Sequence, residues 1–406
     1  MKGAFKFPMI KRSGGDSPDP AVYCPANGYV NPNDPIQPWI EYPYTEEKGF
    51  VKILEFQTNS PNNKTFDPSI NNSNRSYNLG WDCSEDFIIT GVSTFSIYYK
   101  DNSVKTVKIY DKTVNTIITS VDFADDNIVG ILDLSNAIFS PLAILSLNDN
   151  PSLTEVLFPA EFTAASVSTF RIYNTGFTGI LDLRTLKNFP SQLYFWNNPN
   201  MTGILFPQNA TGSINQIYAY STGLTGVLDL SMLSNFTTPY FMLHTNPNLT
   251  GVIFTSNPIT AACGGLQLQN TGISTLDLSM FVTLSTGATI YFNDNPNLLN
   301  VIMPVVNTGF ISAFRCYNCP NIGYINFTGI STSKASQSID IKNNNWTADI
   351  VNRILVDLNS ISVAGFSSRT INIGGNNSDP DSSSGGYDGI AARNSLIAKG
   401  FNVIIT

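Results

Sequence analysis

Ten positions recur along this chain of 406 residues at a nearly constant step of 23 to 25 residues. They are Asp126, Asn150, Thr175, Asn198, Thr222, Asn246, Thr271, Asn295, Cys319 and Asn344. Each one follows an apolar-x-apolar stretch, such as Leu193-Tyr194-Phe195 before Asn198. A repeat this regular predicts a solenoid, in which each coil stacks on the previous one. Because a solenoid offers a long repeated surface and seldom a deep pocket, the period favours a binding protein over an enzyme.

The spacing also predicts which side chains are buried. The two apolar residues of each short strand point into the stack, and parallel strands of successive coils pair about 4.8 Å apart. The Asn, Thr or Cys that follows turns inward and satisfies backbone groups of the adjacent turn. We therefore expect one right-handed stack from residue 126 to residue 344 with these ten ladder residues buried. The segments between the strands contain Pro, Gly, Ser and Thr, which indicates irregular or 3₁₀ walls without long helices.

A longer period of about 48 residues lies over the short one. Some coils carry T-G-x-T-G-x-L-D-L (Thr175 to Leu183, Thr222 to Leu230), and the alternate coils carry N-P-x-L/M-T (Asn198 to Thr202, Asn246 to Thr250). The combined unit, L-x-L-x-x-N-P-x-L-T-G-V-x-F, resembles the leucine-rich repeat, whose core is L-x-x-L-x-L-x-x-N/C-x-L. The resemblance implies a mainly β leucine-rich-repeat solenoid with parallel strands over residues 113–345.

Two segments precede the repeats. Residues 1–46 are rich in Pro, Asn and Gly, which predicts an extended attachment arm. Residues 47–112 alternate in the manner of strands, and we expect a small β-sandwich-like domain that caps the first coil. The stretch from Trp81 to Lys112 resembles the polycystic-kidney-disease-type β-sandwich pattern, although Trp81-Asp82-Cys83 lacks the glycines of that family's Trp-Gly-Asp-Gly turn.

Residues 346–406 follow a different pattern. The helical spacing of Ile350, Ile354 and Leu358 predicts a helix from Thr347 to Leu358 with Thr347 as its N-cap. A strand (370–373), a polar loop (374–388), a second helix (390–398) and a final strand (401–405) are expected to follow. Such an α/β cap would cover the open apolar end of a solenoid.

This ending also resembles a known family. Its motifs A-D-I-V-N-R-I-L-V-D-L, I-N-I-G-G-N-N and A-x-x-S-L-I-A-K-G-F-N-V-I are similar to a cap of leucine-rich-repeat proteins of tailed bacteriophages. The similar proteins are virion or tail-fibre components, so the resemblance implies a virion protein.

Composition excludes several classes of partner. The chain has 22 basic and 30 acidic residues, a net charge of -8 and no basic stripe, which predicts no nucleic-acid binding. No stretch approaches the about 18 apolar residues of a membrane helix, which predicts no membrane insertion. The N-terminus lacks the apolar core of a signal peptide. No residue pattern indicates a cofactor.

Four features could carry chemistry. Cys316-x-x-Cys319 has no second Cys or His pair to complete a metal site, so its place in the strand and the ladder favours a structural role. The aspartates of the L-D-L segments recur too far apart for a glycosidase pair and are expected to be solvated or to cap turns. They are Asp133, Asp182, Asp229 and Asp277. His244 is the only histidine. The loop 379–388 has the oxygen-rich side chains of a calcium loop without its downstream Glu, so calcium binding stays open.

The outward strand positions form the most informative set. If the apolar pairs point inward, the position after each pair places Tyr173, Trp196, Tyr220 and His244 in one row. The position between the apolar residues places Tyr194 and Tyr218 beside that row. Flat aromatic faces among Asn and Asp side chains hold sugar rings or contact a protein partner, whereas tyrosines also simply suit strand surfaces. We select these six residues as the candidate binding site.

The sequence therefore favours a non-enzymatic structural or recognition protein of a phage virion, such as a tail or head fibre or a decoration protein. Residues 1–46 would contact other virion proteins, and the solenoid, as a monomer or a trimer, would present its aromatic residues to a host-surface glycan or protein. One alternative is a leucine-rich-repeat adhesin of the bacterial cell surface. The other is a polysaccharide-degrading tailspike.

Overall fold

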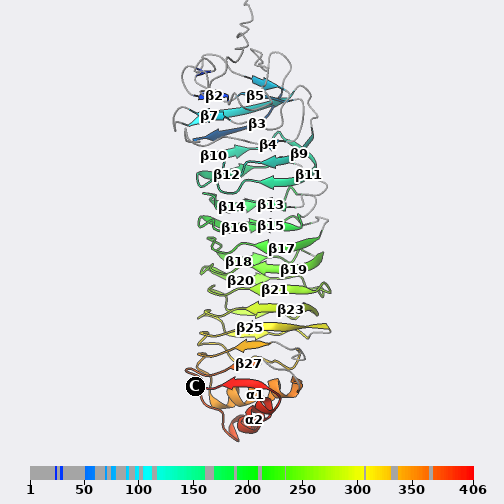
Figure 1. Ribbon diagram of the computed structural model, residues 1–406, viewed down its shortest axis with the longest axis vertical. Coiled ribbons are helices and arrows are strands. Elements are labelled where there is room, and N and C mark those ends of the chain that lie inside the picture. Colours follow the sequence, from blue (N-terminus) through cyan, green and yellow to red (C-terminus); the bar gives the residue numbers. More distant parts are fainter. Residues whose placement is uncertain are drawn as a thin grey trace, which may run out of the picture. The chain divides into compact units, whose positions relative to one another are not determined.

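The structure is a computed structural model (Figure 1). It describes residues 23–24, 28–30, 51–59, 69–70, 75–78, 88–90, 97–99, 104–111, 117–160, 169–186, 190–208, 213–233, 235–305, 308–330, 337–364 and 369–406. These residues are mainly β and include two α-helices, α1 (Ala348–Ile361) and α2 (Gly389–Ala398). They divide into two compact units, one of residues 1–178 and 184–190 and one of residues 179–183 and 191–406.

The first unit begins with an antiparallel sheet and a mixed sheet in which β10 (Ile128–Asp133) and β12 (Leu153–Leu157) are parallel. The three-stranded sheet has the order β1 (Tyr23–Cys24), β2 (Gly28–Val30), β7 (Ile97–Tyr99). The six-stranded sheet has the order β12, β10, β3 (Val51–Thr58), β8 (Lys105–Asp111), β5 (Arg75–Asn78), β6 (Ile88–Thr90). The strands expected in the small β-domain are therefore present, and β10 of the repeat region joins their sheet through β3.

Within the predicted attachment arm, the structure describes only β1 and β2. Strand β2 pairs antiparallel with β7, so this part of the arm contacts the chain's own β-domain. The rest of residues 1–46 and the segment around Trp81 lie outside the described residues, and the attachment role stays a prediction.

The first unit continues with parallel coils. Strand β9 (Ile117–Asp122) pairs in parallel with β11 (Ile138–Ser146), which pairs in parallel with β13 (Thr169–Arg171). On the other side of β9, the short strand β4 (Ser69–Ile70) pairs antiparallel. The inward residues of these coils are buried, as the repeat predicts: Leu145 is 1% exposed and Leu147 is 0% exposed.

The second unit is a parallel-strand β-solenoid (Figure 1). Its long sheet follows chain order through β15 (Gln192–Tyr194), β17 (Ile214–Tyr218), β19 (Phe236–Met242), β21 (Cys263–Gln267), β23 (Thr283–Tyr291), β25 (Thr308–Arg315), β26 (Ser338–Asp340), β27 (Arg369–Asn372) and β28 (Phe401–Ile404). Every neighbouring pair in this order is parallel. The predicted stacking of coils is confirmed.

A second set of strands was not predicted from the sequence. The L-D-L and N-P-x-L/M-T segments of the second unit form short parallel pairs: β14 (Gly179–Asp182) with β16 (Met201–Leu205), β18 (Gly226–Asp229) with β20 (Leu249–Ile253), and β22 (Thr275–Asp277) with β24 (Asn300–Ile302). Exposed aliphatic side chains gather on these pairs, at Ile180, Leu205, Val227, Ile253 and Ile302. The walls between the long-sheet strands are thus partly regular.

All ten ladder residues are buried, which confirms the predicted register. Asn246 shows the reason. Its Nδ2 donates to the carbonyl oxygens of Leu243 (2.8 Å) in its own coil and Ala219 (2.8 Å) in the previous coil. Its Oδ1 accepts from the backbone N–H and the hydroxyl of Thr222, the ladder residue one coil earlier. The Asn246 amide therefore connects two coils, because it pairs backbone N–H and C=O groups that the turns themselves leave without a backbone partner.

A left-handed residue precedes every ladder residue. The ten residues have φ between 53° and 60° and are Asp125, Asp149, Asn174, Asn197, Ser221, Thr245, Asn270, Asp294, Asn318 and Asn343. Eight of them are Asn or Asp, which adopt this conformation more readily than other non-glycine residues. The chain therefore leaves each long-sheet strand through the same tight turn.

The longer period arises where unlike coils meet. A Cβ on Gly223 of the T-G segment would lie 2.2 Å from the carbonyl oxygen of Pro199 in the N-P segment before it. A Cβ on Gly176 would likewise lie 2.4 Å from the carbonyl oxygen of Pro151, and a Cβ on Gly272 would lie 2.5 Å from that of Pro247. Only glycine allows this approach, so a T-G coil follows each of these N-P coils.

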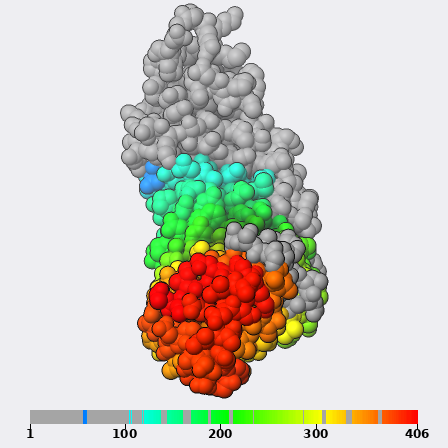
Figure 2. Space-filling view, turned by 60° about the horizontal axis from the view of Figure 1, so that its bottom comes forward, coloured from blue at the N-terminus to red at the C-terminus, as the bar shows by residue number. Residues whose placement is uncertain are grey.

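The C-terminal residues cover the end of the second unit (Figure 2). Helix α1 begins one residue after the predicted N-cap, although Thr347 directs its hydroxyl to the Asp349 carboxylate and makes no cap bond to the backbone. The Asn377 side chain extends the ladder into this cap, because its Oδ1 accepts from the backbone N–H of Asn344 (2.9 Å) and of Trp346 (3.1 Å). The sequence analysis missed this member, since it comes 33 residues after Asn344.

Candidate binding face

Three side chains of each long-sheet strand segment point away from the core. In the coil of β15 they are Gln192, Tyr194 and Trp196, which alternate with the buried Leu193 and Phe195. Strand β17 pairs in parallel with β15 on one side and with β19 on the other, so equivalent positions on adjacent strands become neighbours about 4.8 Å apart. Rings at equivalent positions must therefore contact one another.

The row after the apolar pair is a stack of rings. The rings of Trp196 and Tyr220 have centroids 5.6 Å apart and planes 2° apart. Those of Tyr220 and His244 have centroids 4.7 Å apart and planes 12° apart. Ring faces are therefore turned toward neighbouring rings in this row, and its contact with an extended ligand stays a prediction. The stack stabilises the coils, at about 0.5–1.5 kcal/mol for each ring pair.

The row between the apolar residues joins this stack. Tyr194 lies 5.3 Å from Trp196 and 5.1 Å from Tyr218 between ring centroids. The Tyr194 hydroxyl donates to the side-chain oxygen of Gln216. Tyr194, Trp196, Tyr218, Tyr220 and His244 therefore form one connected cluster of partly exposed rings, as the sequence predicts for five of its six site residues.

Tyr240 is a member that the sequence analysis missed. Its ring meets that of Tyr218 edge to face, with centroids 6.0 Å apart and planes 72° apart. Tyr240 lies on the outward position before the apolar pair, whereas the six predicted site residues occupy the two later outward positions. Extending the same alternation by one step to Gln192, Gln216 and Tyr240 would have found it. We name Tyr194, Trp196, Tyr218, Tyr220, Tyr240 and His244 the aromatic face.

Tyr173 belongs to the first compact unit. It is partly exposed after β13, and its carbonyl accepts from the backbone N–H of Asp149 (3.0 Å). Burial, followed by the nearby Asp149 carboxylate, raises the pKa of Tyr173. Its predicted place in the binding row stays a prediction.

The aromatic face is electrically neutral near pH 7. Outward positions at 192–196, 216–220 and 240–244 carry no Asp, Glu, Lys or Arg. Burial raises the pKa of Tyr218, with the neighbouring tyrosines adding to the effect, and burial also raises that of Tyr220. Burial against Tyr220 lowers the pKa of His244, which therefore favours its neutral form.

We expect the His244 imidazole to titrate below about 6.5, the ordinary value for histidine. Because the folded state then binds fewer protons than the unfolded state, stability should rise with pH between the depressed folded pKa and the unfolded pKa. It should fall as the solution is acidified through that window. An NMR titration reads this site alone, since the chain has one histidine. The urea-unfolded chain is the control, and a folded pKa at or above the unfolded one would contradict the expectation.

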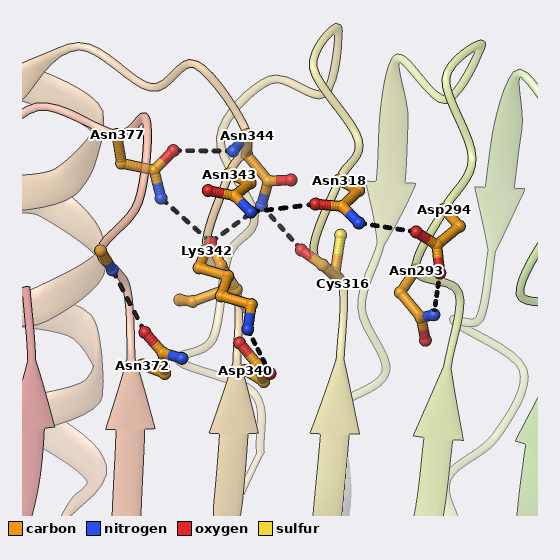
Figure 3. A network of polar contacts seen from close by, with 12 residues as sticks. Asn293, Asp294, Cys316, Asn318, Asp340, Lys342, Asn343, Asn344, Asn372 and Asn377 are labelled. Atoms are coloured by element: carbon orange, nitrogen blue, oxygen red, sulfur yellow. Dashed lines mark hydrogen bonds and ion pairs between the residues drawn. The ribbon is translucent and has the colours of Figure 1, made fainter. Parts of the chain in front are cut away.

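A charged zone follows on the same sheet, farther along the second unit (Figure 3). The Arg315 guanidinium lies 4.4 Å from the Tyr291 ring centroid, and Lys342 Nζ lies 5.5 Å from that of Tyr317. Lys342 Nζ is also 3.9 Å from Asp340 Oδ2. Burial raises the pKa of Asp340, and Lys342 opposes that shift. This zone distinguishes the coils of β23–β26 from the neutral aromatic face.

A surface ladder of amides runs beside the charged zone (Figure 3). Asn318 Nδ2 donates to Asp294 Oδ1 (2.7 Å), and Asn343 Nδ2 donates to Asn318 Oδ1 (3.1 Å). Each of these residues is the left-handed residue of its coil. The polar row is therefore explained by the turn, and it accounts for the Asn content of these coils without a ligand.

The cysteines have structural positions. Cys316 and Cys319 are both 0% exposed and free. Cys319 takes a ladder position, where its N–H donates to Asn344 Oδ1 (2.9 Å) and its thiol contacts the Phe292 carbonyl (3.4 Å). Burial holds the pKa of Cys316 well above its ordinary value, so that thiol is a poor nucleophile. The structural interpretation is confirmed.

The aspartates of the L-D-L segments cap turns. Asp229 Oδ1 accepts from the backbone N–H of Ser231 (2.8 Å), and Asp133 and Asp277 make the same bond to Ser135 and Ser279. The predicted capping role is confirmed for these three.

The candidate calcium loop is closed by its own hydrogen bonds. Asp381 Oδ1 accepts from Asn352 Nδ2 (2.8 Å) and from the backbone N–H of Ser383 (2.9 Å) and Ser384 (2.7 Å). The Ser384 hydroxyl, which donates to Asp381 Oδ2, and then these donors hold the pKa of Asp381 well below its ordinary value. In the described part of the chain, no three His, Cys, Asp or Glu side chains are grouped as metal ligands would be. Hydrogen bonds within the protein therefore engage the Asp381 carboxylate, which would otherwise be the best calcium ligand of this loop.

No described helix is long and apolar enough to cross a membrane. Comparisons of the chain with protein-family models, with curated proteins and with solved structures found no match.

Proposed function

We propose that this chain is a non-enzymatic recognition protein of a bacteriophage virion that binds a host-surface partner through its aromatic face. One observation carries the binding role. Six rings from three neighbouring strands lie in continuous contact on the outward side of a rigid sheet, where no formal charge is present. Amide side chains border the rings, because Gln216 accepts from the Tyr194 hydroxyl and Gln267 donates to the Tyr240 hydroxyl.

Mutual contact of the rings supports binding as well as stability. A ring that is already held by its neighbours loses little conformational entropy when it contacts a partner. Tyr and Trp side chains also dominate binding energy in recognition surfaces, because they combine large apolar area with a polar tip.

The virion assignment is supported by the resemblance of residues 347–405 to caps of phage leucine-rich-repeat proteins. The proposal also includes that the coils are leucine-rich repeats, that residues 1–46 contact other virion proteins and that the chain assembles as a trimer. Mass spectrometry of purified particles tests it directly. Peptides of this chain at structural stoichiometry would support the proposal, and their absence from washed particles would exclude it.

The second candidate is a bacterial surface adhesin, which would use the same aromatic face. Cell fractionation separates the two, because an adhesin would be found on uninfected cells. A polysaccharide-degrading tailspike is less favoured, because Asp133, Asp229 and Asp277 are occupied as turn caps. Release of reducing ends from host polysaccharide by the purified chain would restore that alternative.

Replacing Trp196 by Ala is expected to weaken attachment to the partner by about 1–3 kcal/mol, the usual loss at a hot-spot residue. It should also lower the free energy of unfolding by about 1 kcal/mol, because the stack with Tyr220 is lost. The measurement is adsorption of particles that carry the variant. Tyr291→Ala, which lies in the charged zone, is the matched control. Unchanged adsorption of folded Trp196→Ala particles would contradict the role of the aromatic face.

A further inference from the structure

Tyr240 differs from the other rings of the aromatic face, because it lies across the neighbouring strand. On β21, the residue paired with Tyr240 is Gly265. A Cβ on Gly265 would lie 2.7 Å from Tyr240 Cε2 and 2.8 Å from Cζ, and a Cβ on Gly264 would lie 3.3 Å from Cδ2. The ring therefore occupies the space that two glycines leave open.

Two hydrogen bonds hold the Tyr240 ring in this position. Gln267 Nε2 donates to the Tyr240 hydroxyl (2.9 Å), and that hydroxyl lies 3.3 Å from Thr289 Oγ1, two strands away. The Tyr218 ring approaches from the other side at 72°. The resulting group is one aromatic ring bordered by an amide, a hydroxyl and a second ring, from four successive strands.

The charge and the aliphatic content of this surface restrict its ligand. Outward positions from 192 to 293 along the long sheet carry no Asp, Glu, Lys or Arg. A charged group buried here would stay unpaired, which is costly. Among the described residues of the second unit, exposed aliphatic side chains lie on β14, β16, β18, β20, β24 and α2 and at Leu299, Val305 and Val363, and not on the aromatic face. The chemistry of the face is that of aromatic rings with amide and hydroxyl groups.

We propose that Tyr240, with Tyr218, Gln267 and Thr289, forms a subsite for a neutral sugar residue of a glycan that extends across the strands toward Tyr194. The inference rests on the proposed recognition function and names its ligand class. The apolar side of the sugar packs on the aromatic rings, and its hydroxyl groups bond to Gln267 and Thr289. An acidic glycan is excluded from this subsite by the missing cation.

The test is a glycan array probed with the purified full chain, followed by titration of the best neutral glycan. Gly265→Ala should displace the Tyr240 ring and weaken binding about tenfold or more, the change expected on losing a hot-spot contact. Tyr240→Ala should have at least that effect, and Tyr240→Phe a smaller one, since it keeps the ring without its two hydrogen bonds. Gly203→Ala is the matched control. Gly203 lies on β16, outside the long sheet, and the nearest atom to its added Cβ would be Ile180 Cγ1 at 3.5 Å.

The outcomes separate the subsite from the proposed function. Neutral-glycan binding that is lost in Gly265→Ala and kept in Gly203→Ala supports the subsite, with circular dichroism showing that both variants fold. Binding that depends on Trp196 but is unchanged in Gly265→Ala and Tyr240→Ala overturns the subsite and leaves the recognition function standing. Binding only to acidic glycans or only to a protein overturns the ligand class. If particles carrying Trp196→Ala adsorb normally, the proposed function itself fails.

Discussion

Replacing Asn246 by Leu is expected to lower the free energy of unfolding by about 3–5 kcal/mol, one of the largest single effects in the second unit. The variant would leave the Leu243 carbonyl and the Thr222 N–H without the amide, and the Ala219 carbonyl and the Thr222 hydroxyl would keep only their bond to each other (3.2 Å). Asn246 is 0% exposed, so water cannot replace the amide. From the sequence alone, the loss of a partner by one buried polar group would predict a decrease of only about 1–3 kcal/mol in the free energy of unfolding.

Urea unfolding and hydrogen exchange of the Thr222 amide measure this loss. The exchange measurement matters because coils of a solenoid can open locally. Asn248→Leu is the control, since Asn248 is exposed and the bond of its backbone carbonyl to Gly226 N–H is unaffected. A loss below about 1 kcal/mol in Asn246→Leu, or an equal loss in both variants, would show that the ladder does not connect the coils energetically.

Gly223→Ala is expected to cost about 3–5 kcal/mol, although it adds one methyl group. The new Cβ would lie 2.2 Å from the Pro199 carbonyl oxygen and 3.3 Å from that of Met201. Both atoms belong to the backbone of the preceding coil, so relief requires two coils to separate and not a side chain to rotate. The hydrogen bond from Gly223 N–H to the Asn198 carbonyl (3.2 Å) would be strained as well.

Thermal or urea unfolding of Gly223→Ala beside Gly203→Ala measures this effect. Gly203 lies in a strand of the same unit, and an added Cβ there makes an ordinary contact at 3.5 Å, so that variant should stay within about 1 kcal/mol of the parent. Similar stability of the two variants would mean that the approach of T-G and N-P segments does not cause the longer period of the repeat.

The candidate site shows how far local patterning extends. Alternation around Leu193 and Phe195 identified Tyr194 and Trp196 as outward, and the constant step placed Tyr218, Tyr220 and His244 beside them. The orientation of these rings could not be predicted, because neighbouring strands about 4.8 Å apart make equivalent rings stack on each other and so cover their faces. The alternation reaches Tyr240 one step earlier, but its contact with Gly265 could not be predicted, because Gly265 is distant in sequence and adjacent only across the sheet.

By itself, the sequence determined the coils, their register and the buried ladder, because each depends on residues within one repeat and the repeat recurs ten times. It also determined the C-terminal helices, whose apolar spacing and polar ends are local signals. Only the tertiary structure decided what unlike coils do to each other. The parallel pairs such as β14–β16, the approach of Gly223 to Pro199 and the extension of the ladder to Asn377 all join residues of different segments. Their energies depend on distances across the stack, which a pattern read along one chain does not contain.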